Sequence, residues 1–444
     1  MNAIKKSLLS FFLFKIDISK KNIFLKEGGW ILLSQAVTFF GTLLLIKVLT
    51  SKLSPSIYGE LTLGLTVSSL INNIISGGIN NGIARFYAIA NDKNDLKGYF
   101  GDSLKLQCYV STFIISFGSV LIGIIFLLGY TKWLLLLTAS LLLSLLSGLN
   151  STFNGIQFAA RQRAVLAFNN ILESCLKILL SVCFILFFGS NAANVVFGYA
   201  VSSFIVIISQ LFFLGKAIPI KKGFKGNGDW IKKIWMFSWP FSTWGLFAWF
   251  QQVSDRWILS GFGKIEDVGN YSVLFQIGYS PIILASSMFM SFLSPILFQR
   301  LGDATNKNKI TNLKKITIKF TWLCLGLTIF CFTLSFILHK FIFKILLDVE
   351  YQKFSYLLPW MVLAGGFMAA HSILGSRISS LLKTKELALQ QIFMFLIAVG
   401  LNFLGVITGG LNGIVASLVL FSFIYFLWMY FFSNSLIKKE LLNS

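Results

Sequence analysis

Residues 164–188 read AVLAFNNILESCLKILLSVCFILFF, an apolar stretch interrupted by a few strongly polar residues. At 1.5 Å per residue, a helix of this length crosses the roughly 30 Å hydrocarbon core of a bilayer. Polar residues recur at every fourth position, namely Asn169, Glu173, Lys177 and Ser181. Positions with this spacing share one helix face. The stretch therefore predicts a membrane-spanning helix whose polar face turns toward a bundle interior or a water-filled cavity.

The rest of the chain has the same apolar character. Of its 444 residues, 56% are hydrophobic and 12% are charged, about half the charged share of a soluble globular protein. Apolar runs of spanning length fall at 28–50, 61–84, 106–129, 133–156, 164–188, 194–215, 234–260, 270–297, 317–338, 355–376, 388–408 and 411–432. These runs predict an all-α polytopic membrane protein with twelve transmembrane helices, and they exclude a soluble or disordered chain.

Lysine and arginine predict the orientation of the spans. The chain has 38 basic and 16 acidic residues, a formal net charge of +22. Of the basic residues, 29 lie in the N-terminal segment, every second loop and the C-terminal tail, whereas 8 lie in the alternate loops and span ends. Because loops rich in Lys and Arg stay cytoplasmic, both termini are predicted to be cytoplasmic. Topology thus accounts for the charge, and no nucleic-acid partner is expected.

A basic connection at residues 216–233 divides the chain into two sets of six predicted spans. We expect a cytoplasmic N-terminal segment (1–27), an N-terminal six-helix bundle (28–215), a basic linker (216–233), a C-terminal six-helix bundle (234–432) and a cytoplasmic tail (433–444). A shift of 210 residues lays 48–63 over 258–273 and pairs Gly59 with Gly269. This pairing indicates a parallel repeat with a central site between the halves, as in secondary transporters. The alternative is that any two membrane hairpins look this similar.

Charged residues within the spans are candidates for a binding site, because the bilayer excludes charges that have no partner or water. Glu173 and Lys177 form an i, i+4 pair that either lines a cavity or only joins neighbouring helices. Asp255 and Arg256 lie toward the predicted outer end of the seventh span, and the 210-residue shift places Lys47 beside Arg256. Lys47 and Arg256 would flank one central cavity, unless both extend to the outer interface.

Further polar residues lie in or at the ends of predicted spans. Arg85 and Arg377 close the second and tenth spans on the cytoplasmic side, where each is either a substrate contact or an interface anchor. Gln35, Asn72 and Gln276 lie within the first, second and eighth spans. Their amides would hydrogen-bond sugars or merely bridge helices, and both interpretations stay open.

Motifs for catalysis or cofactor binding are absent from the sequence. There is no P-loop, no HExxH and no paired-carboxylate or nucleophile motif. The five cysteines include no CxxC, and the two histidines, His339 and His371, are far apart in the chain. We therefore expect no metal site and no cofactor. A transporter is the expected class, and an enzyme is not.

Four segments combine polar and glycine residues in an order and spacing typical of one family. They are SPSIYGELTLGLTVSSL (54–70), GINNGIARFY (78–87), GIQFAARQRAVLAFNNILES (155–174) and VSDRWILSGFGKIEDVGNYSVLFQI (253–277). Together they resemble the polysaccharide or O-antigen flippases (Wzx type) of the multidrug/oligosaccharidyl-lipid/polysaccharide (MOP) exporter superfamily. The resemblance implies a MATE-like fold, with two six-helix bundles around a central cavity. It also implies a cationic cavity, in which the matching positions are Arg85 and the Asp255–Arg256 pair.

The resemblance further implies a substrate, a membrane and partners. The substrate would be a polyprenyl-pyrophosphate-linked sugar repeat unit that crosses the bacterial inner membrane. Membrane lipids, a polysaccharide polymerase and a chain-length regulator would be the partners. We hypothesise that Lys47, Lys177 and Arg256 bind the pyrophosphate, and that Glu173 and Asp255 neutralise these cations in the empty cavity. The alternative is a cation-coupled multidrug exporter of the same superfamily, which should favour acidic cavity residues.

Overall fold

The computed structural model describes residues 18–217, 226, 228–301, 307–381 and 384–443, and these contain helices but no strand. The first half consists of α2 (Ile18–Thr50), α3 (Pro55–Ile71), the π-helix η1 (Asn72–Ser76), α4 (Gly77–Asp92), α5 (Leu96–Leu127), the 3-10 turn η2 (Thr131–Trp133), α6 (Leu134–Ala159), α7 (Arg163–Phe188) and α8 (Ala192–Ala217). The expected all-α fold class is confirmed.

The second half repeats this pattern. It consists of α9 (Asp229–Phe262), α10 (Ile265–Leu274), the π-helix η3 (Phe275–Tyr279), α11 (Ser280–Leu301), α12 (Lys307–Leu346), the 3-10 segment η4 (Val349–Leu357), α13 (Leu358–Ser380) and α14 (Thr384–Asn443). In both halves a π-helical turn interrupts the second span, at η1 and at η3. A π-bulge bends a helix locally and is frequent at functional sites.

The long helix α14 is a hairpin of two spans. Gly410 has φ +52°, a left-handed conformation that glycine adopts without steric cost, and the helix reverses there. Hydrogen bonds join the two arms. Ser417 Oγ donates to the Leu401 carbonyl at 2.7 Å, and Tyr425 Oη donates to Gln391 at 2.9 Å, so the arms lie side by side. The predicted break between residues 408 and 411 therefore falls at the observed turn.

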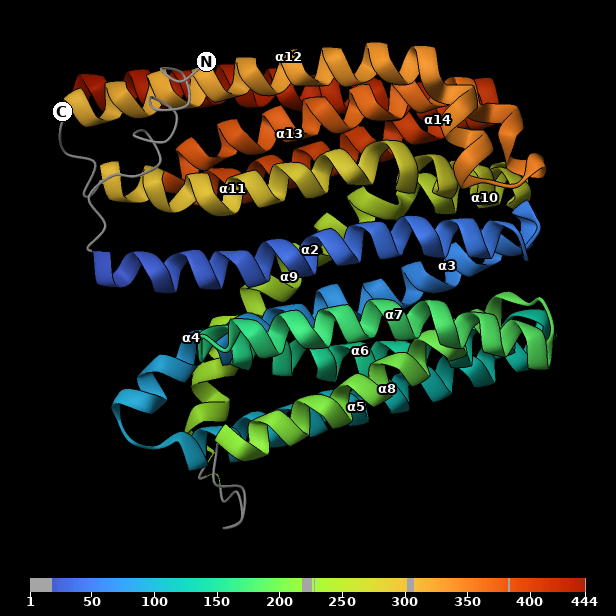
Figure 1. Ribbon diagram of the computed structural model, residues 1–444, viewed down its shortest axis with the longest axis horizontal. Coiled ribbons are helices and arrows are strands. Elements are labelled where there is room, and N and C mark those ends of the chain that lie inside the picture. The colour runs from blue at the N-terminus through green and yellow to red at the C-terminus, as the bar shows by residue number, and fades with distance from the viewer. Residues whose placement is uncertain (1–17, 218–225, 227, 302–306, 382–383, 444) are drawn as a thin grey trace.

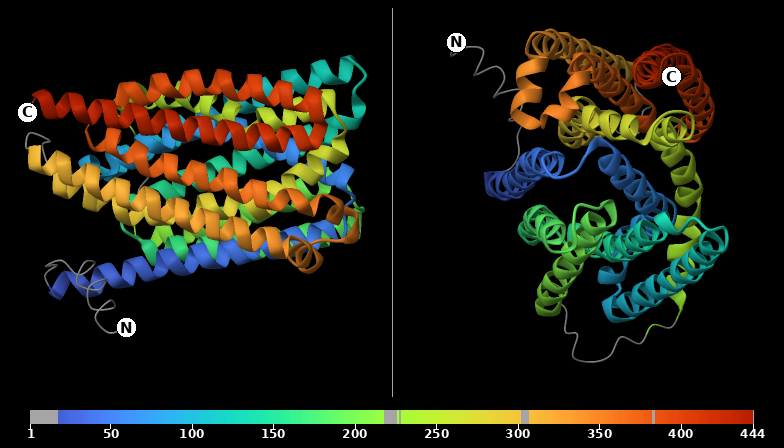
Figure 2. Two further views of the ribbon diagram at one scale, coloured as in Figure 1. Left: turned by 90° about the horizontal axis from the view of Figure 1, so that it is seen from above. Right: turned by 90° about the vertical axis from the view of Figure 1, so that its right-hand side faces the viewer.

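The helices are consistent with the twelve predicted spans. Within the described residues, nine helices are long and apolar enough to cross a membrane, and the bent pair α3 and α4 makes ten. The second arm of α14 makes eleven, and α9, with 34 residues, is long enough to make twelve. The chain is a multi-pass membrane protein with both described ends, at α2 and α14, on one side (Figures 1 and 2).

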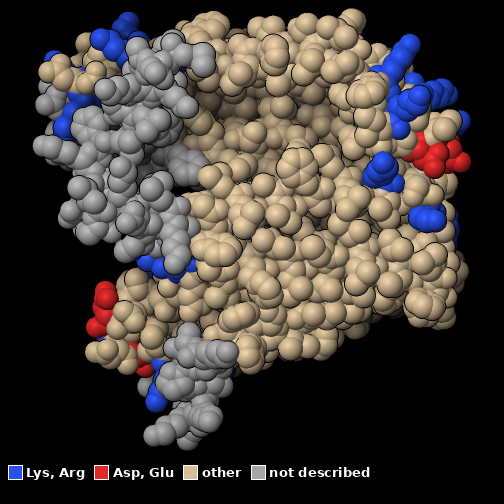
Figure 3. Space-filling model, viewed as in Figure 1, with Lys and Arg blue, Asp and Glu red and all other residues tan. Residues whose placement is uncertain are grey.

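Charge on the surface follows this arrangement. In Figure 3 lysine and arginine gather at the two ends of the long axis, and a broad uncharged band lies between them. Large apolar side chains such as Phe117, Phe187 and Phe330 are exposed in the spans. Exposed aromatic and aliphatic side chains over a full band are what a lipid-facing surface requires.

The two halves form two layers, with α9 crossing between them. Figure 1 shows α5 to α8 together on one side and α10 to α14 on the other, while α9 runs obliquely from the first layer to the second. Helix α9 packs against α4 in the first half and against α14 in the second. Its first residues are fixed to α5, where the Asp102 carboxylate accepts the Gly228 and Trp230 backbone N–H groups, each at 3.1 Å. These contacts satisfy backbone donors at the start of α9.

The halves also meet directly along α3 and α10, at residues related by the 210-residue shift. A Cβ on Gly59 would collide with the Ile265 carbonyl oxygen, and one on Gly269 would collide with the Pro55 carbonyl oxygen. Ser272 Oγ donates to Thr62 Oγ1 at 3.1 Å, and these two residues are 210 apart. Reciprocal contacts between equivalent residues are the signature of a two-fold relation. The geometry supports the repeat that the sequence indicated, and we call this contact the outer seam.

Several helices extend past the predicted segment boundaries. Helix α9 begins at Asp229, within the predicted linker (216–233). Helix α2 begins at Ile18, within the predicted N-terminal segment, and α14 continues through the predicted tail to Asn443. Residues 1–17, 218–225, 227 and 444 of those segments lie outside the described residues.

Candidate functional site

A cavity of about 750 Å³ lies between α3 of the first half and the helices α9, η3 with α11, α13 and α14 of the second half. Asp255 and Arg256 are the charged members of its described lining. Amides and hydroxyls supply much of the remaining polar surface, including Gln251, Gln276 and Asn402. A concave site with a few convergent polar groups is the usual form of a ligand-binding site.

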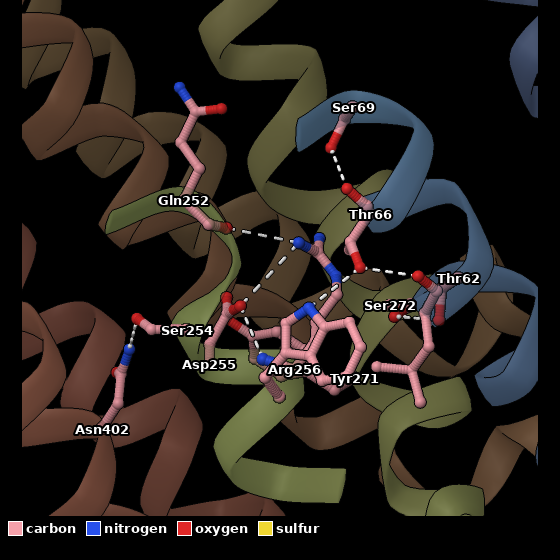
Figure 4. Close-up of polar contacts among 12 residues, drawn as sticks. Thr62, Thr66, Ser69, Gln252, Ser254, Asp255, Arg256, Tyr271, Ser272 and Asn402 are labelled. Atoms are coloured by element: carbon pink, nitrogen blue, oxygen red, sulfur yellow. Dashed lines mark hydrogen bonds and ion pairs between the residues drawn. The ribbon is translucent and has the colours of Figure 1, made fainter. Parts of the chain in front are cut away.

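Arg256 presents its guanidinium group on the wall of this cavity (Figure 4). Its Nη1 donates to the Gln252 carbonyl at 3.3 Å and lies 3.8 Å from Asp255 Oδ1. The guanidinium carbon lies 4.6 Å from the centre of the Phe275 ring. Because 3.8 Å exceeds hydrogen-bonding distance, the carboxylate compensates the guanidinium charge without a direct hydrogen bond. The guanidinium therefore keeps donors for a ligand.

Asp255 is buried, and both of its oxygens are bonded elsewhere. Oδ2 accepts the Tyr271 hydroxyl at 2.6 Å, and Oδ1 accepts the Arg256 backbone N–H at 2.7 Å. Asp255 is 4% exposed and Tyr271 is fully buried. A buried carboxylate needs such donors, since loss of its hydration is costly. The Asp255–Arg256 pair that the sequence predicted is thus present in the cavity wall, in an open geometry.

Aromatic rings and amides form much of the rest of the wall. The rings of Phe275 and Tyr279 stack with centroids 4.4 Å apart, and the His371 ring lies 3.8 Å from that of Tyr425. Tyr425 donates to Gln391, which in turn bonds Gln251 on α9. All of these residues line the cavity. The arrangement offers flat apolar faces beside fixed hydrogen-bonding groups.

A smaller cavity of about 350 Å³ lies between α2 and α7. Lys177 Nζ and Glu173 Oε1 are 2.7 Å apart, and Glu173 Oε2 accepts from Asn150 Nδ2 at 2.8 Å. Gln35 faces the pair from α2. Leu284 of α11 lines this cavity and the larger one, so a single side chain borders both. The predicted polar face of α7 therefore turns inward: Glu173 and Lys177 line this cavity, and Asn169 and Ser181 are buried against α8.

The other predicted residues lie in three different settings. Gln276 lines the larger cavity and accepts the Tyr58 hydroxyl at 3.2 Å. Lys47, in the last turn of α2, and Arg85, on α4, are exposed and line neither cavity. Asn72 lies in η1 outside both cavities and donates to Ser147 of α6 at 2.8 Å. The structure brings Lys177 and Arg256 to cavities but does not bring Lys47 beside them.

Arg377 is fully buried among α12, α13 and α14, away from both cavities. Its Nε donates to Thr317 at 2.5 Å, and Nη1 donates to Ser433 at 3.2 Å and Asn434 at 3.1 Å. No ion pair of this guanidinium occurs among the described residues. Arg377 therefore joins three helices in the second half.

Several cavity residues were absent from the sequence-based site. They are His371, Tyr425, Gln391 and Asn402, which the sequence does not single out. They lie more than a hundred residues from Arg256 in sequence, and single polar residues in apolar spans carry no spacing signal. As for metals, the described part of the chain brings together no group of three or more His, Cys, Asp or Glu side chains that could hold an ion.

Comparison with known families adds to this geometry. The profile of the family described as "Polysaccharide biosynthesis protein" matches residues 24–301, which is more than half of the chain. The chain belongs to this family. The match runs from within α2 to the end of α11, and so includes Arg256 and the outer seam. Among curated protein sequences none matches the chain.

Solved structures show the same fold at low sequence identity. An inward-facing multidrug resistance MATE family transporter of the MOP superfamily aligns with a TM-score of 0.71 and 16% identity, over 93% of this chain and 99% of that one. The outward-facing conformation of such a transporter gives 0.61 at 16% identity, over 94% and 97%. A MOP superfamily transporter from Pyrococcus furiosus, described as having a binding pocket of reverse polarity, gives 0.61 at 14% identity, over 93% and 96%. The expected MATE-like fold is confirmed, and the alignment is better with the inward-facing form.

Proposed function

We propose that this protein is a flippase that moves a polyprenyl-pyrophosphate-linked oligosaccharide repeat unit of an O-antigen, capsule or exopolysaccharide across the bacterial inner membrane. The observation that carries the proposal is the Arg256 guanidinium on the wall of a cavity between two transporter-like halves. Membership of the polysaccharide biosynthesis family supports a glycan as the cargo. Transport, and not catalysis, is the activity proposed.

Arg256 is suited to the pyrophosphate. A guanidinium has five N–H donors in a planar fork, which match phosphate oxygens. Its weak compensation by Asp255, at 3.8 Å, leaves net attraction for an anion in a partly dehydrated site. A cation in such a cavity repels cationic drugs, so the alternative of a cation-coupled multidrug exporter has less support.

The remaining cavity wall is suited to the sugars. Sugar hydroxyls both donate and accept hydrogen bonds, as do the amides of Gln251, Gln391 and Asn402. The apolar face of a sugar ring packs on aromatic rings such as those of Tyr279 and Tyr425. The polyprenyl tail needs no polar path, because it stays in the bilayer throughout.

Lys177 supplies a second cation on the route. It lies in the smaller cavity, across Leu284 from the larger one, and is held by Glu173 when no ligand is present. Glu173 and Asp255 play the same part in the two halves, as charge-balancing carboxylates. Lys47, Arg85 and Arg377 lie outside the cavities, so a contribution of these residues requires a different conformation.

Alternating access follows from the contacts between the halves. The outer seam of α3 and α10 closes one end, and α4 packs closely along α9. In the repeat, α11 corresponds to α4 and α2 corresponds to α9. Among the described residues, α11 and α2 do not pack closely against each other. The better alignment with an inward-facing transporter agrees with a closed outer end. Rocking of the halves would open the seam and present the head group to the other side.

The membrane potential would assist this movement. Outward passage of an anion across an inside-negative membrane is favoured by about 2.3 kcal/mol per charge per 100 mV. Ion coupling through Asp255 or Glu173 is compatible with the site but is not required. Cytoplasmic termini, a polysaccharide polymerase and a chain-length regulator complete the proposed setting.

Complementation of a flippase-deficient strain tests the proposal. Wild-type protein should restore surface polysaccharide, and the Arg256→Gln variant should not, at equal membrane levels. Full output from Arg256→Gln, Lys177→Gln and Lys47→Gln variants, each tested singly, would contradict the assignment of these cations to the pyrophosphate. If the wild-type protein increased drug efflux but did not restore surface polysaccharide, the multidrug exporter would be favoured instead.

A further inference from the structure

Tyr271 of α10 contacts the charged pair without lining the cavity. Its side chain is fully buried, and its hydroxyl donates to Asp255 Oδ2 at 2.6 Å (Figure 4). A hydroxyl bonded to a carboxylate at this distance is a strong, charge-assisted hydrogen bond. Asp255 and Tyr271 lie on consecutive helices, α9 and α10, which a short connection at Gly263 and Lys264 brings together.

The bond from Tyr271 changes what Asp255 can do for Arg256. A carboxylate beside a guanidinium normally forms a direct, often bidentate, ion pair at less than 3 Å. Here Arg256 Nη1 lies 3.8 Å from Asp255 Oδ1, and the carboxylate accepts hydrogen bonds from the tyrosine hydroxyl and the Arg256 backbone N–H. The guanidinium turns to the Gln252 carbonyl and the face of Phe275 instead.

We propose that Tyr271 is a positioning residue that keeps the Asp255 carboxylate off the Arg256 guanidinium, so that Arg256 stays available to an anionic ligand. This inference rests on the proposed function, in which Arg256 binds the pyrophosphate. Without the hydroxyl, Oδ2 of Asp255 loses its partner in a buried site, and the guanidinium is the charged donor beside it. The carboxylate then closes onto Arg256 and competes with the ligand.

A positioning role for Tyr271 differs from that of an ordinary buried hydrogen bond, because its effect on ligand affinity depends on the charge of Asp255. If the hydroxyl acts through the charge of Asp255, its removal matters only while that charge is present. The Tyr271→Phe variant should lose affinity, and a second change, Asp255→Asn, should restore it. An amide at position 255 keeps an acceptor and a donor of similar shape, so the local packing is retained.

The test uses the full chain, purified and reconstituted in lipid nanodiscs, with farnesyl pyrophosphate as the probe and farnesol as its uncharged control. Isothermal titration calorimetry gives the affinity of the wild type and of Arg256→Gln, Asp255→Asn, Tyr271→Phe and the double variant Asp255→Asn/Tyr271→Phe. Tyr99→Phe is the matched control, because Tyr99 is also fully buried and donates its hydroxyl to the Ile83 carbonyl, at 2.5 Å, outside the cavity.

The expected pattern is specific. Tyr271→Phe weakens binding about tenfold, as for loss of a charge-assisted contact, whereas the double variant binds at least as tightly as the wild type, and Tyr99→Phe is unchanged. Wild-type affinity in Tyr271→Phe overturns the inference, and so does a double variant as weak as Tyr271→Phe. Should Tyr271→Phe fail to fold, Asp255→Asn carries the test, since loss of affinity there overturns the inference. Unchanged binding by Arg256→Gln defeats the proposed function itself.

Discussion

Each half of the molecule places one cation and one carboxylate at a cavity, and the two pairs differ in geometry. Lys177 and Glu173 in the first half are 2.7 Å apart, and Asn150 holds the far oxygen of Glu173. Arg256 and Asp255 in the second half are 3.8 Å apart, and Tyr271 and a backbone N–H donate to the carboxylate. A tight pair is satisfied within the protein, whereas an open pair keeps a cation for a ligand. We therefore propose Arg256 as the primary anion site.

The largest expected effect is the loss of that open cation. Arg256→Gln should reduce restored surface polysaccharide to the background of the deficient strain, because the pyrophosphate loses its fork of donors. Lys177→Gln should cause a smaller loss, since Lys177 already has a carboxylate partner. Lys132→Gln, an exposed lysine paired with Glu60, is the control and should retain full output. A greater loss from Lys177→Gln than from Arg256→Gln would reverse the comparison.

A second effect concerns the seam that holds the halves together. Gly269→Ala should lower the free energy of unfolding by about 1–3 kcal/mol, the usual cost of overpacking, because its Cβ meets the Pro55 carbonyl. It should also shift the protein away from the conformation in which the seam is closed. Thermal unfolding in detergent and cysteine labelling at the outer end measure the two effects. Gly261→Ala is the matched control, as nothing lies within 4 Å of its Cβ, and equal stability of the two variants would contradict the packing argument.

Arg377 is expected to stabilise the fold and to take no part in ligand binding, unlike Arg256 and Lys177. Arg377→Gln should lower the free energy of unfolding by about 1–2 kcal/mol, because it removes hydrogen bonds that join α12, α13 and α14. The affinity of the folded fraction for farnesyl pyrophosphate should be unchanged. A loss of affinity at unchanged stability would instead place Arg377 in the binding site, as the sequence suggested.

The smallest effect is expected at the tight pair. Glu173→Gln frees Lys177 and should raise the affinity for farnesyl pyrophosphate about threefold, a small change because Lys177 is 34% exposed and its charge is screened. The double variant Glu173→Gln/Lys177→Gln should bind like Lys177→Gln alone. A fall in affinity in Glu173→Gln would show that the carboxylate itself supports the ligand.

Much of the fold was predictable because a bilayer imposes length and apolarity on every span. The break in α14, the polar face of α7 and the two-fold pairing of Gly59 with Gly269 all appear in the sequence as runs, spacing or a shift. Helix ends beyond the apolar core were not predictable, since polar residues continue a helix into water without a change of period. This explains the early start of α9 at Asp229.

The candidate site was predictable only in its charges. Glu173, Lys177, Asp255 and Arg256 stand out because charge is rare in a span. Arg377 stands out for the same reason, yet it lies among helices and not at a cavity. The role of Tyr271 depends on a 2.6 Å bond between two helices, and a tyrosine in an apolar span gives no sign of such a bond.

Translocation in proteoliposomes tests the central claim most directly. A fluorescent, short-chain polyprenyl-pyrophosphate-linked sugar is placed in one leaflet, and its arrival in the other is followed by dithionite quenching. Wild-type protein should give rapid exchange, and Arg256→Gln should give exchange at the protein-free rate. Exchange by Arg256→Gln at the wild-type rate would contradict it.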